Sequence, residues 1–323
     1  MNNDLDVKNT QLSNISLIDR FMEFMHLEND AISPDTLRTY INSIEHFFDY
    51  CKAYNLNPLS LSEQDFQHYR NLLLKEHKPS SVQVYMSAIK RFYDMAVENH
   101  IIPVNNAHHV KITKFTEEQK NIKFLSKADV QRLFDAIDDP DPKYRLRNKS
   151  IIALMVLGGA RTVEISNMKF GDLIYSIDQK VLTGIRVQAK RHIRVIPLRA
   201  DVSMLLSKYI NLVFANPKAT DYLFFALERH NNKNLDRRSI RRIVDTYLKK
   251  IGVKRVGLSA HALRHTAATY AYNETKDINQ VQKFLGHTNP STTSIYVHTL
   301  KQNNPLENFD VDIHIDDIAG GNN

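Results

Sequence analysis

The stretch from Ser259 to His298 constrains this chain more than any other part of its sequence. It carries His261 and Arg264 in an H-x-x-R arrangement, an L-G-H motif that ends at His287, and Tyr296 nine residues later. A guanidinium matches the paired oxygens of a phosphate, an imidazole can donate or accept a proton, and a phenol can attack phosphorus. These residue types in this order indicate phosphoryl-transfer chemistry.

Helix signals predict that three short helices deliver these side chains. Ser259 can cap a helix that places the H-x-x-R pair on one face. A second helix is expected over 277–285, where Gly286 can end it. After an Asn-Pro turn, Ser291 can cap a last helix that carries Tyr296.

A metal site is the main alternative for this stretch, because His261 and His265 stand four residues apart. The zinc-binding H-E-x-x-H helix needs a glutamate after its first histidine, whereas this chain has Ala262 there. An isolated H-x-x-R is common by chance, and a lone tyrosine on a helix more often belongs to a core or an interface. The whole combination carries the argument, and we expect neither a metal nor another cofactor.

The composition is that of a globular protein without export or membrane signals. With 323 residues, 42% hydrophobic and 24% charged, the chain is long enough for two domains. Its N-terminus lacks a signal-peptide pattern, and no apolar run approaches the length of a membrane span. Cys51 is the only cysteine, which excludes an internal disulfide, and its apolar helical setting favours a buried, unreactive thiol. We expect a cytoplasmic protein encoded by a bacterium, phage or mobile element.

Charge is distributed unevenly behind the overall net charge of +7. Residues 1–105 hold 9 basic and 14 acidic side chains, residues 106–300 hold 33 and 17, and residues 301–323 hold 1 and 5. A solvated basic surface would explain a single run of this kind. Here the basic excess surrounds a phosphate-binding combination, which favours double-stranded nucleic acid as the partner.

Turn and helix signals divide the chain into two domains. We expect a disordered start over 1–14, an all-α domain over 15–104, a linker over 105–122, a second domain over 123–300 and a tail over 301–323. Four helices are predicted in the first domain, since Ser-Pro at 33–34, a capping box at 62–65 and Pro79 mark starts after a first amphipathic run.

The second domain combines helices with a few strands. Two glycines end one helix and Thr162 opens the next, so Arg161 lies at a bend, with Glu164 as a supporting acid. Apolar and β-branched runs predict strands over 173–175, 181–187, 193–198 and 222–225, the second and third paired as a hairpin.

Together these motifs resemble those of the tyrosine recombinase (phage integrase) family. The family patterns are H-x-x-R, L-G-H, a later Tyr, G-x-R-x-x-E around Arg161, and G-K-G-x-K-x-R-x-[VI]-P-L, which the segment 187–198 matches with one residue fewer in its turn. The first domain resembles the family's core-binding domain through S-P-x-T-L-x-x-Y and A-I-K-x-F-Y. The resemblance covers roughly residues 16–300.

The resemblance implies a mainly α fold with a small antiparallel β-sheet. An N-terminal all-α core-binding (SAM-like) domain and a C-terminal α+β catalytic domain would close around DNA as a C-clamp. The implied activity is site-specific DNA recombination through a 3′-phosphotyrosyl intermediate and a Holliday junction, in integration and excision or in dimer and cointegrate resolution. Because the first core helix begins near residue 16, we expect a Xer-like enzyme without an arm-binding domain.

The resemblance also assigns roles to individual residues. Tyr296 would be the nucleophile, Arg161 and Arg264 would hold the non-bridging phosphate oxygens, His261 would assist proton transfer from the phenol, and His287 would hydrogen-bond the phosphate.

The general acid for the leaving oxygen would come from the hairpin turn. Lys190 is the candidate and Arg191 its rival, because the turn is one residue short. Further DNA contacts are expected on exposed helix faces, although a solvated surface residue explains each of them about as well. These positions are Arg38, Thr39, Gln83, Ser87, Lys90, Arg91, Arg191, Arg238, Arg241 and Arg242.

From Phe309 to Asp316 the tail over 301–323 alternates apolar residues with aspartates and His314, as a strand that needs a partner edge does. The resemblance implies that this tail docks on a neighbouring protomer in a homotetramer on two DNA sites, with accessory DNA-bending proteins as possible partners.

Two alternatives for the function of the protein stay open: a type IB topoisomerase-like enzyme, which shares the chemistry, and a DNA-binding regulator with a decayed site. The six filled catalytic positions argue against decay.

Overall fold

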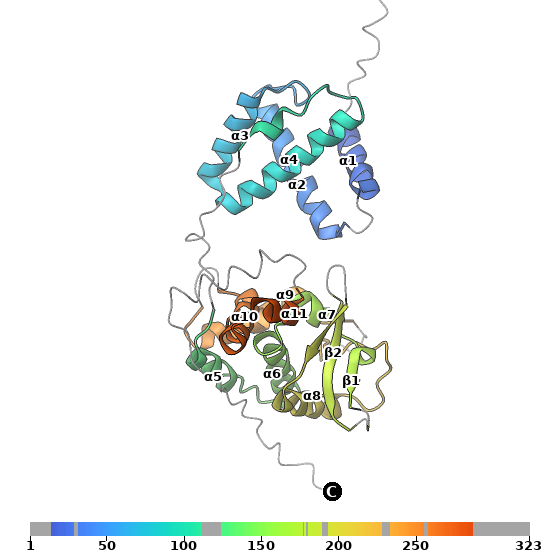
Figure 1. Cartoon of the computed structure of the whole chain (residues 1–323), viewed down its shortest axis with the longest axis vertical. Helices are drawn as coiled ribbons and strands as arrows, with labels where there is room; N and C mark the ends of the chain where they lie inside the picture. The colour runs from blue at the N-terminus through green and yellow to red at the C-terminus, as the bar shows by residue number, and fades with distance from the viewer. Residues whose placement is uncertain are drawn as a thin grey trace, which may run out of the picture. The chain divides into compact units, whose positions relative to one another are not determined.

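The computed structural model describes residues 14–28, 32–111, 124–176, 178, 180–188, 193–227, 233–254 and 258–286. The chain divides into two compact units, residues 1–119 and 120–323, each with its own hydrophobic core. Figure 1 shows a helical first unit and a second unit that combines helices with a sheet. None of the helices in the described ranges has both the length and the apolar content that a membrane span requires.

Four α-helices make up most of the described part of the first unit, as the sequence predicts. The Ser33 hydroxyl accepts a hydrogen bond from the Thr36 amide at 3.1 Å, with Pro34 in the first turn, and Ser62 forms the expected capping box with Asp65. The bounds are α1 Asn14–Glu28, α2 Pro34–Ala53, α3 Glu63–Glu76 and α4 Pro79–Glu98.

Aromatic side chains fill the core of the first unit. The Phe47 ring is fully buried, with its centroid 5.8 Å from that of Phe66 and 5.0 Å from that of Tyr69. Cys51 is buried beside them, and burial raises the pKa of its thiol to about 12. The expectation of a buried thiol is therefore confirmed, and the raised pKa disfavours the reactive thiolate.

The first unit extends into the segment that we expected to be linker. Residues Asn106–His109 form a short 3-10 helix, η1, and both Ala107 and Val110 are buried in the first core. The Lys90 ammonium donates a hydrogen bond to the Val110 carbonyl at 2.9 Å and fixes this segment to α4. A single 3-10 turn is too short to show a hydrophobic period, which is why the sequence pattern missed it.

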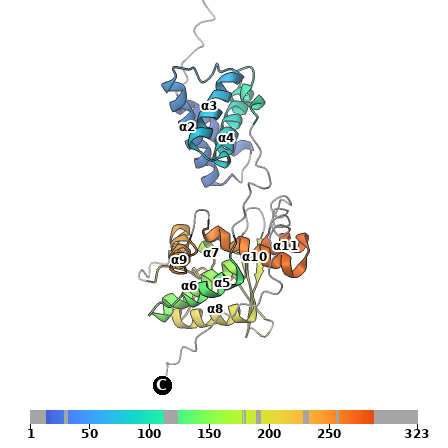
Figure 2. The same ribbon diagram turned by 90° about the vertical axis from the view of Figure 1, so that its left-hand side faces the viewer.

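Helix α6 runs through the centre of the second unit. All residues from Leu146 to Val156 are buried, as expected for a helix enclosed by other elements. Helix α10 packs on one side of α6 and α8 on the other (Figures 1 and 2). The helices of this unit are α5 Lys127–Asp135, α6 Pro142–Val156, α7 Thr162–Asn167, η3 Phe170–Asp172, α8 Ala200–Val213, α9 Arg237–Lys250, α10 Ala260–Thr275 and α11 Ile278–Leu285.

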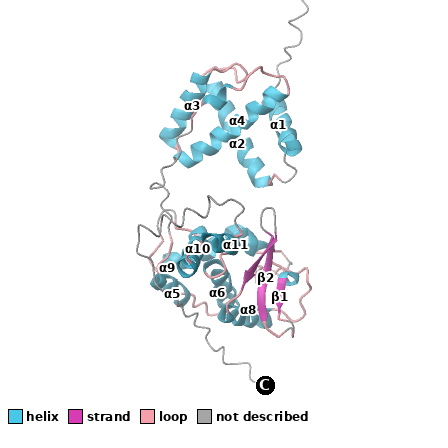
Figure 3. Ribbon diagram, viewed as in Figure 1, coloured by secondary structure: helices cyan, strands magenta, loops and turns pink. Residues whose placement is uncertain are grey.

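A small antiparallel sheet covers one side of the second unit (Figure 3). Its strands are β1 Leu173–Tyr175, β2 Leu182–Gln188 and β3 Ile193–Pro197, in the order β1-β2-β3. The register pairs Gln188 with Ile193, which confirms the predicted hairpin. The buried residues of β3 are Arg194 and Ile196, so the sheet turns a guanidinium towards the interior of the unit.

One predicted strand is wrong. Residues 222–225 form no strand with a neighbour, and only isolated bridges join Tyr222 to Lys169 and Phe225 to Asn234. Leu223 and Phe224 are fully buried. The apolar run that resembled a strand therefore reflects packing in the core.

Candidate active site

The structure brings together the start of α10, the end of α11 and the bend before α7. Three of the six predicted catalytic side chains lie here, namely Arg161, His261 and Arg264. Ser259 occupies the N-cap position of α10 as predicted, but its side chain makes no capping hydrogen bond. Predicted residues that lie outside the described part of the chain are Lys190, Arg191, His287 and Tyr296.

The carboxylate of Glu164 lies at the centre of this region. Its side chain has 0% exposure. Its Oε1 atom accepts a hydrogen bond from Nη1 of Arg161 at 2.8 Å, and Oε2 accepts one from the Arg161 backbone amide at 2.8 Å. Since Arg161 is the N-cap of α7, Glu164 fixes both the helix start and the direction of the arginine side chain.

A second guanidinium, that of Arg194 on β3, binds the same carboxylate. Its Nη2 lies 2.8 Å from Oε2 of Glu164 and its Nε lies 3.4 Å from Oε1, so the contact is bidentate. The sequence motifs assigned no role to Arg194. The only signal was its place in the family pattern of the hairpin, because an arginine that alternates with apolar residues does not by itself reveal which carboxylate it meets.

Arg264 supplies the third guanidinium and is almost completely buried, with 2% exposure. Its Nη1 donates to the carbonyl of Gly159 and lies 4.0 Å from Oε2 of Glu164, while its Nη2 donates to the carbonyl of Leu285 at 2.7 Å. The predicted phosphate ligand therefore also clamps the bend before α7 to the end of α11.

These contacts keep Glu164 ionised. Burial alone raises the pKa of Glu164, but the hydrogen bond and charge of Arg194, followed by those of Arg161, hold that pKa below its ordinary value. Near neutral pH, one carboxylate thus faces three guanidiniums, and the four groups carry a net charge of +2. Such a cluster attracts an anion.

His261 lies at the exposed edge of this cluster. Partial burial and then the charges of Arg264, Arg161 and Arg241 lower the pKa of its imidazole from the ordinary value of 6.5. The ring is therefore neutral near pH 7 and can accept a proton.

The metal-site alternative involves His261 and His265. The centroid of the His261 ring lies 4.6 Å from that of His265, but the surrounding arginines disfavour a metal cation at this pair. In the described ranges, no group of three or more His, Cys, Asp or Glu side chains is placed to hold a metal.

Helix α9 adds positive charge next to the cluster. Its apolar side, with Ile240 and Val244, is buried, while Arg238, Arg241 and Arg242 are exposed as predicted. Helix α9 packs against both α7 and α10, and the charge of Arg241 contributes to the lowered pKa of His261, so this basic face lies close to the site.

The candidate DNA-binding residues of the first unit differ in their exposure and in their contacts within the protein. Arg38, Thr39 and Gln83 are exposed, and Ser87 is half-buried. The Lys90 ammonium donates hydrogen bonds to the carbonyls of Val110 and His108. Lys90 would have to give up these bonds in order to contact a phosphate. Arg91 lies over the Phe24 ring, 5.7 Å from its centroid, and 3.7 Å from the Asp94 carboxylate.

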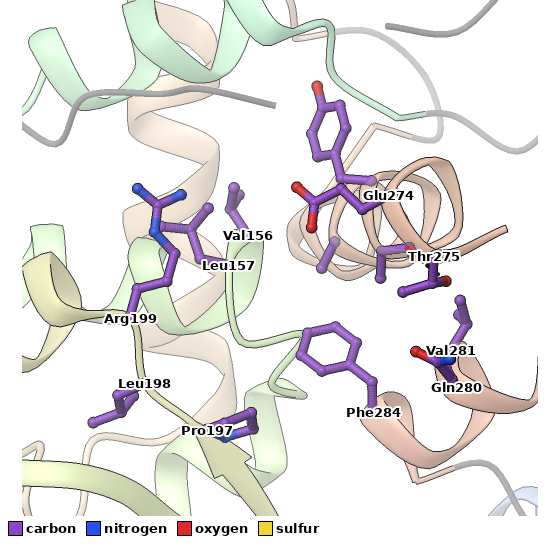
Figure 4. Close-up of a pocket in the computed structure, with 13 residues that line it drawn as sticks. Val156, Leu157, Pro197, Leu198, Arg199, Glu274, Thr275, Gln280, Val281 and Phe284 are labelled. Atoms are coloured by element: carbon purple, nitrogen blue, oxygen red, sulfur yellow. Dashed lines mark hydrogen bonds between the residues drawn. The ribbon is translucent and has the colours of Figure 1, made fainter. Parts of the chain in front are cut away.

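An apolar pocket of about 380 Å³ lies between α10, α11 and the ends of α6 and β3. Figure 4 shows the Phe284 ring pointing from α11 towards Pro197 across this space. Arg199 and Glu274 are its charged lining residues. None of the three described catalytic candidates lines it, so it is separate from the predicted chemistry.

Gly159 and Gly252 allow a matched test of how tightly the site is packed. Both have positive φ, +60° and +72°, and an added Cβ would lie 2.7 Å from Leu285 Cδ2 at Gly159 but would meet nothing within 4 Å at Gly252. Gly252→Ala should therefore lose only the backbone cost, about 1–2 kcal/mol of unfolding free energy. Gly159→Ala should lose clearly more in denaturant unfolding. Equal losses would contradict the close contact of the bend with α11.

Comparison with known proteins finds relatives over both units. Residues 123–303 match the family model of the phage integrase family, and residues 17–102 match that of its N-terminal SAM-like domain. The tyrosine recombinase XerH of Campylobacter jejuni is 29% identical over 279 residues, which are 81% of this chain and 74% of that protein. The tyrosine recombinase XerC of Bacillus subtilis is 27% identical over 290 residues, 87% of this chain and 91% of that protein.

Solved structures share the fold at low identity. XerH bound to a palindromic difH substrate, in a post-cleavage complex, superposes with a TM-score of 0.70 at 21% identity over 82% of this chain and 77% of that chain. A λ integrase tetramer bound to a Holliday junction superposes with a TM-score of 0.66 at 19% identity over 87% of this chain and 76% of that chain. On the two matching family models, this chain belongs to the phage integrase family of tyrosine recombinases, the enzymes that cleave and rejoin DNA.

Proposed function

We propose that this chain is a site-specific recombinase whose Tyr296 cuts DNA. The phenolic oxygen attacks the scissile phosphorus and forms a 3′-phosphotyrosyl bond while the bond to the 5′ oxygen breaks. The phenol proton passes to His261, and Lys190 on the hairpin turn, or its rival Arg191, protonates the leaving oxygen. His287 donates a hydrogen bond to the phosphate. Religation reverses the steps with a new 5′ hydroxyl.

The observation that carries this proposal is the net positive cluster around Glu164 beside a neutral imidazole. Arg161 has a side chain with 31% exposure, so its outward N–H groups can reach a phosphate oxygen. Arg264 binds the bend and the end of α11 through the carbonyls of Gly159 and Leu285. Preorganised guanidiniums of this kind stabilise the charge that develops on phosphorus in the transition state.

We propose a tetramer on two DNA sites as the working assembly. The λ integrase tetramer on a Holliday junction, which shares the fold, supports this assembly. Exchange between DNA sites also requires four strand cuts, one for each protomer. The reaction would take place in the bacterial cytoplasm, on DNA that accessory bending proteins can shape.

The tail over 301–323 is proposed to link neighbouring protomers. Its apolar positions alternate with three aspartates and His314 between Phe309 and Asp316. The pocket beside Phe284, whose charged lining residues are Arg199 and Glu274, offers an apolar surface for the apolar side chains of such a segment. The tail would thus make each active site depend on its neighbour.

The nucleophile is tested with suicide substrates that carry a nick near candidate sites in the native flanking DNA. The wild-type chain should form a covalent protein–DNA band on a denaturing gel, because the released fragment diffuses away and religation fails. Tyr296→Phe should bind the same DNA and form no band, since the attacking oxygen is missing.

Two other outcomes would change the assignment. DNA binding without any covalent band would favour a regulator with a decayed site. A covalent band together with relaxation of supercoiled DNA, but without trapped Holliday junctions, would favour a type IB topoisomerase-like activity.

The lowered pKa of His261 predicts the pH dependence of cleavage. As a proton acceptor the ring must be neutral, so activity is lost as the pH falls through its pKa. The acid limb of the single-turnover rate should lie below about pH 6.5, the ordinary histidine value. His261→Gln should be slow with no such limb, and His26→Gln, at an exposed position in α1, should keep the wild-type profile. An acid limb above the ordinary value would contradict the proton-acceptor role.

Removal of residues 303–323 tests the tail. The shortened chain should still bind a single site but should form fewer tetramers and junctions in gel-shift assays, since the link between protomers is gone. Unchanged cleavage and assembly would rule out this role.

A further inference from the structure

Arg194 is a buried guanidinium that none of the proposed catalytic steps uses. It is 6% exposed and lies on β3. Besides its bidentate contact with Glu164, it donates to the Phe284 carbonyl at 2.7 Å and to the Gly159 carbonyl at 3.2 Å. One side chain therefore joins the hairpin strand, the bend before α7 and the end of α11.

Each of these three segments leads to a proposed catalytic residue. Gly159 lies two residues before Arg161, Phe284 lies three residues before His287, and Arg194 itself follows Lys190 by four residues. Arg194 forms hydrogen bonds to the bend before α7 and to the end of α11, and it belongs to the hairpin strand itself. Its removal would therefore loosen all three segments of the site.

Charge gives Arg194 a second and more specific effect. A phosphodiester carries one negative charge, and the five-coordinate transition state of its cleavage carries two. Arg161 and Arg264 alone would match that charge, but the buried Glu164 carboxylate cancels one of them. Arg194 restores the balance, which returns the cluster to a net charge of +2. Without Arg194, the same carboxylate would hold Arg161 more firmly in an ion pair.

We propose that Arg194 is a positioning residue that neutralises Glu164, so that Arg161 and Arg264 present their full charge to the scissile phosphate. It touches neither the DNA nor the reacting atoms, and it acts through Glu164. This inference rests on the proposed recombinase function, because it assumes that a phosphate occupies the cluster.

A charge-balance experiment tests the proposal. Single-turnover cleavage of the suicide substrate at saturating DNA is measured for the wild type, Arg194→Gln, Glu164→Gln and the double variant, with DNA affinity and thermal unfolding recorded for each. Arg194→Gln should cleave about 10- to 100-fold more slowly, the range found when a group that orients a metal ligand is lost, with DNA affinity nearly unchanged. The double variant, again with a net charge of +2, should cleave faster than Arg194→Gln.

Matched controls separate this role from a loss of folding. Arg147 is also 6% exposed in the same unit, where it bonds to Asn148 and to the Phe225 carbonyl instead of to Glu164. Arg147→Gln should lower the unfolding temperature but leave the cleavage rate of the folded protein unchanged. Arg194→Lys, which keeps the charge without the bidentate geometry, should cleave at an intermediate rate and replaces Arg194→Gln if that variant does not fold.

Two results would overturn the inference while leaving the recombinase function intact. One is a cleavage rate equal to that of the wild type in folded Arg194→Gln. If Arg194→Gln does not fold, the same result in Arg194→Lys would count. The other is a double variant that is folded and no faster than the slow Arg194 variant. A wild-type chain that forms no Tyr296-dependent covalent band would instead refute the proposed function itself.

Discussion

A buried carboxylate that faces three guanidiniums organises the catalytic unit. Glu164 receives Arg161 from its own helix, Arg194 from the sheet and, at 4.0 Å, Arg264 from α10. The two more deeply buried arginines also bind carbonyls of the bend and of α11. The bend with α7, strand β3 and the helices α10 and α11 are thereby fixed around one point. The enclosed helix α6, with α8 and α10 packed against it, provides the rigid support.

The energetics of such a cluster favour a functional explanation. Taking charged groups out of water is costly, and buried ion pairs are often no more stable than the apolar side chains that could replace them. A fold selected for stability alone has little reason to bury one carboxylate with several guanidiniums. A site that must receive an anion and stabilise additional negative charge gains from fixed cations whose orientation is set before the substrate arrives. The exposed arginines of α9 extend the same positive potential away from the cluster.

Local signals predicted much of the fold, and tertiary contacts account for what they missed. Ser33, Ser62 and Gly286 mark helix ends because caps are decided within a few residues. The 3-10 turn after residue 105 and the apolar run at 222–225, which forms no strand, depend on packing against distant residues. The periodicity of hydrophobic residues in the sequence cannot reveal such packing. The sequence motifs identified the candidate catalytic residues. They could not predict that Arg264 is buried or that it forms hydrogen bonds with two backbone carbonyls. The position of Arg194 opposite Glu164 follows from the register of β3 and the bend before α7, which only the three-dimensional arrangement shows.

The most direct test of the account is the chemical identity of the protein–DNA bond. The covalent adduct from the suicide substrate is digested with nuclease and trypsin, and the modified peptide is sequenced by mass spectrometry. The account predicts a nucleotide joined through its 3′ phosphate to the peptide that follows Lys283 and ends at Lys301, with fragment ions that place it on Tyr296, the only tyrosine of that peptide. A nucleotide on another tyrosine, such as Tyr270 or Tyr272, or a linkage through the 5′ phosphate would contradict it.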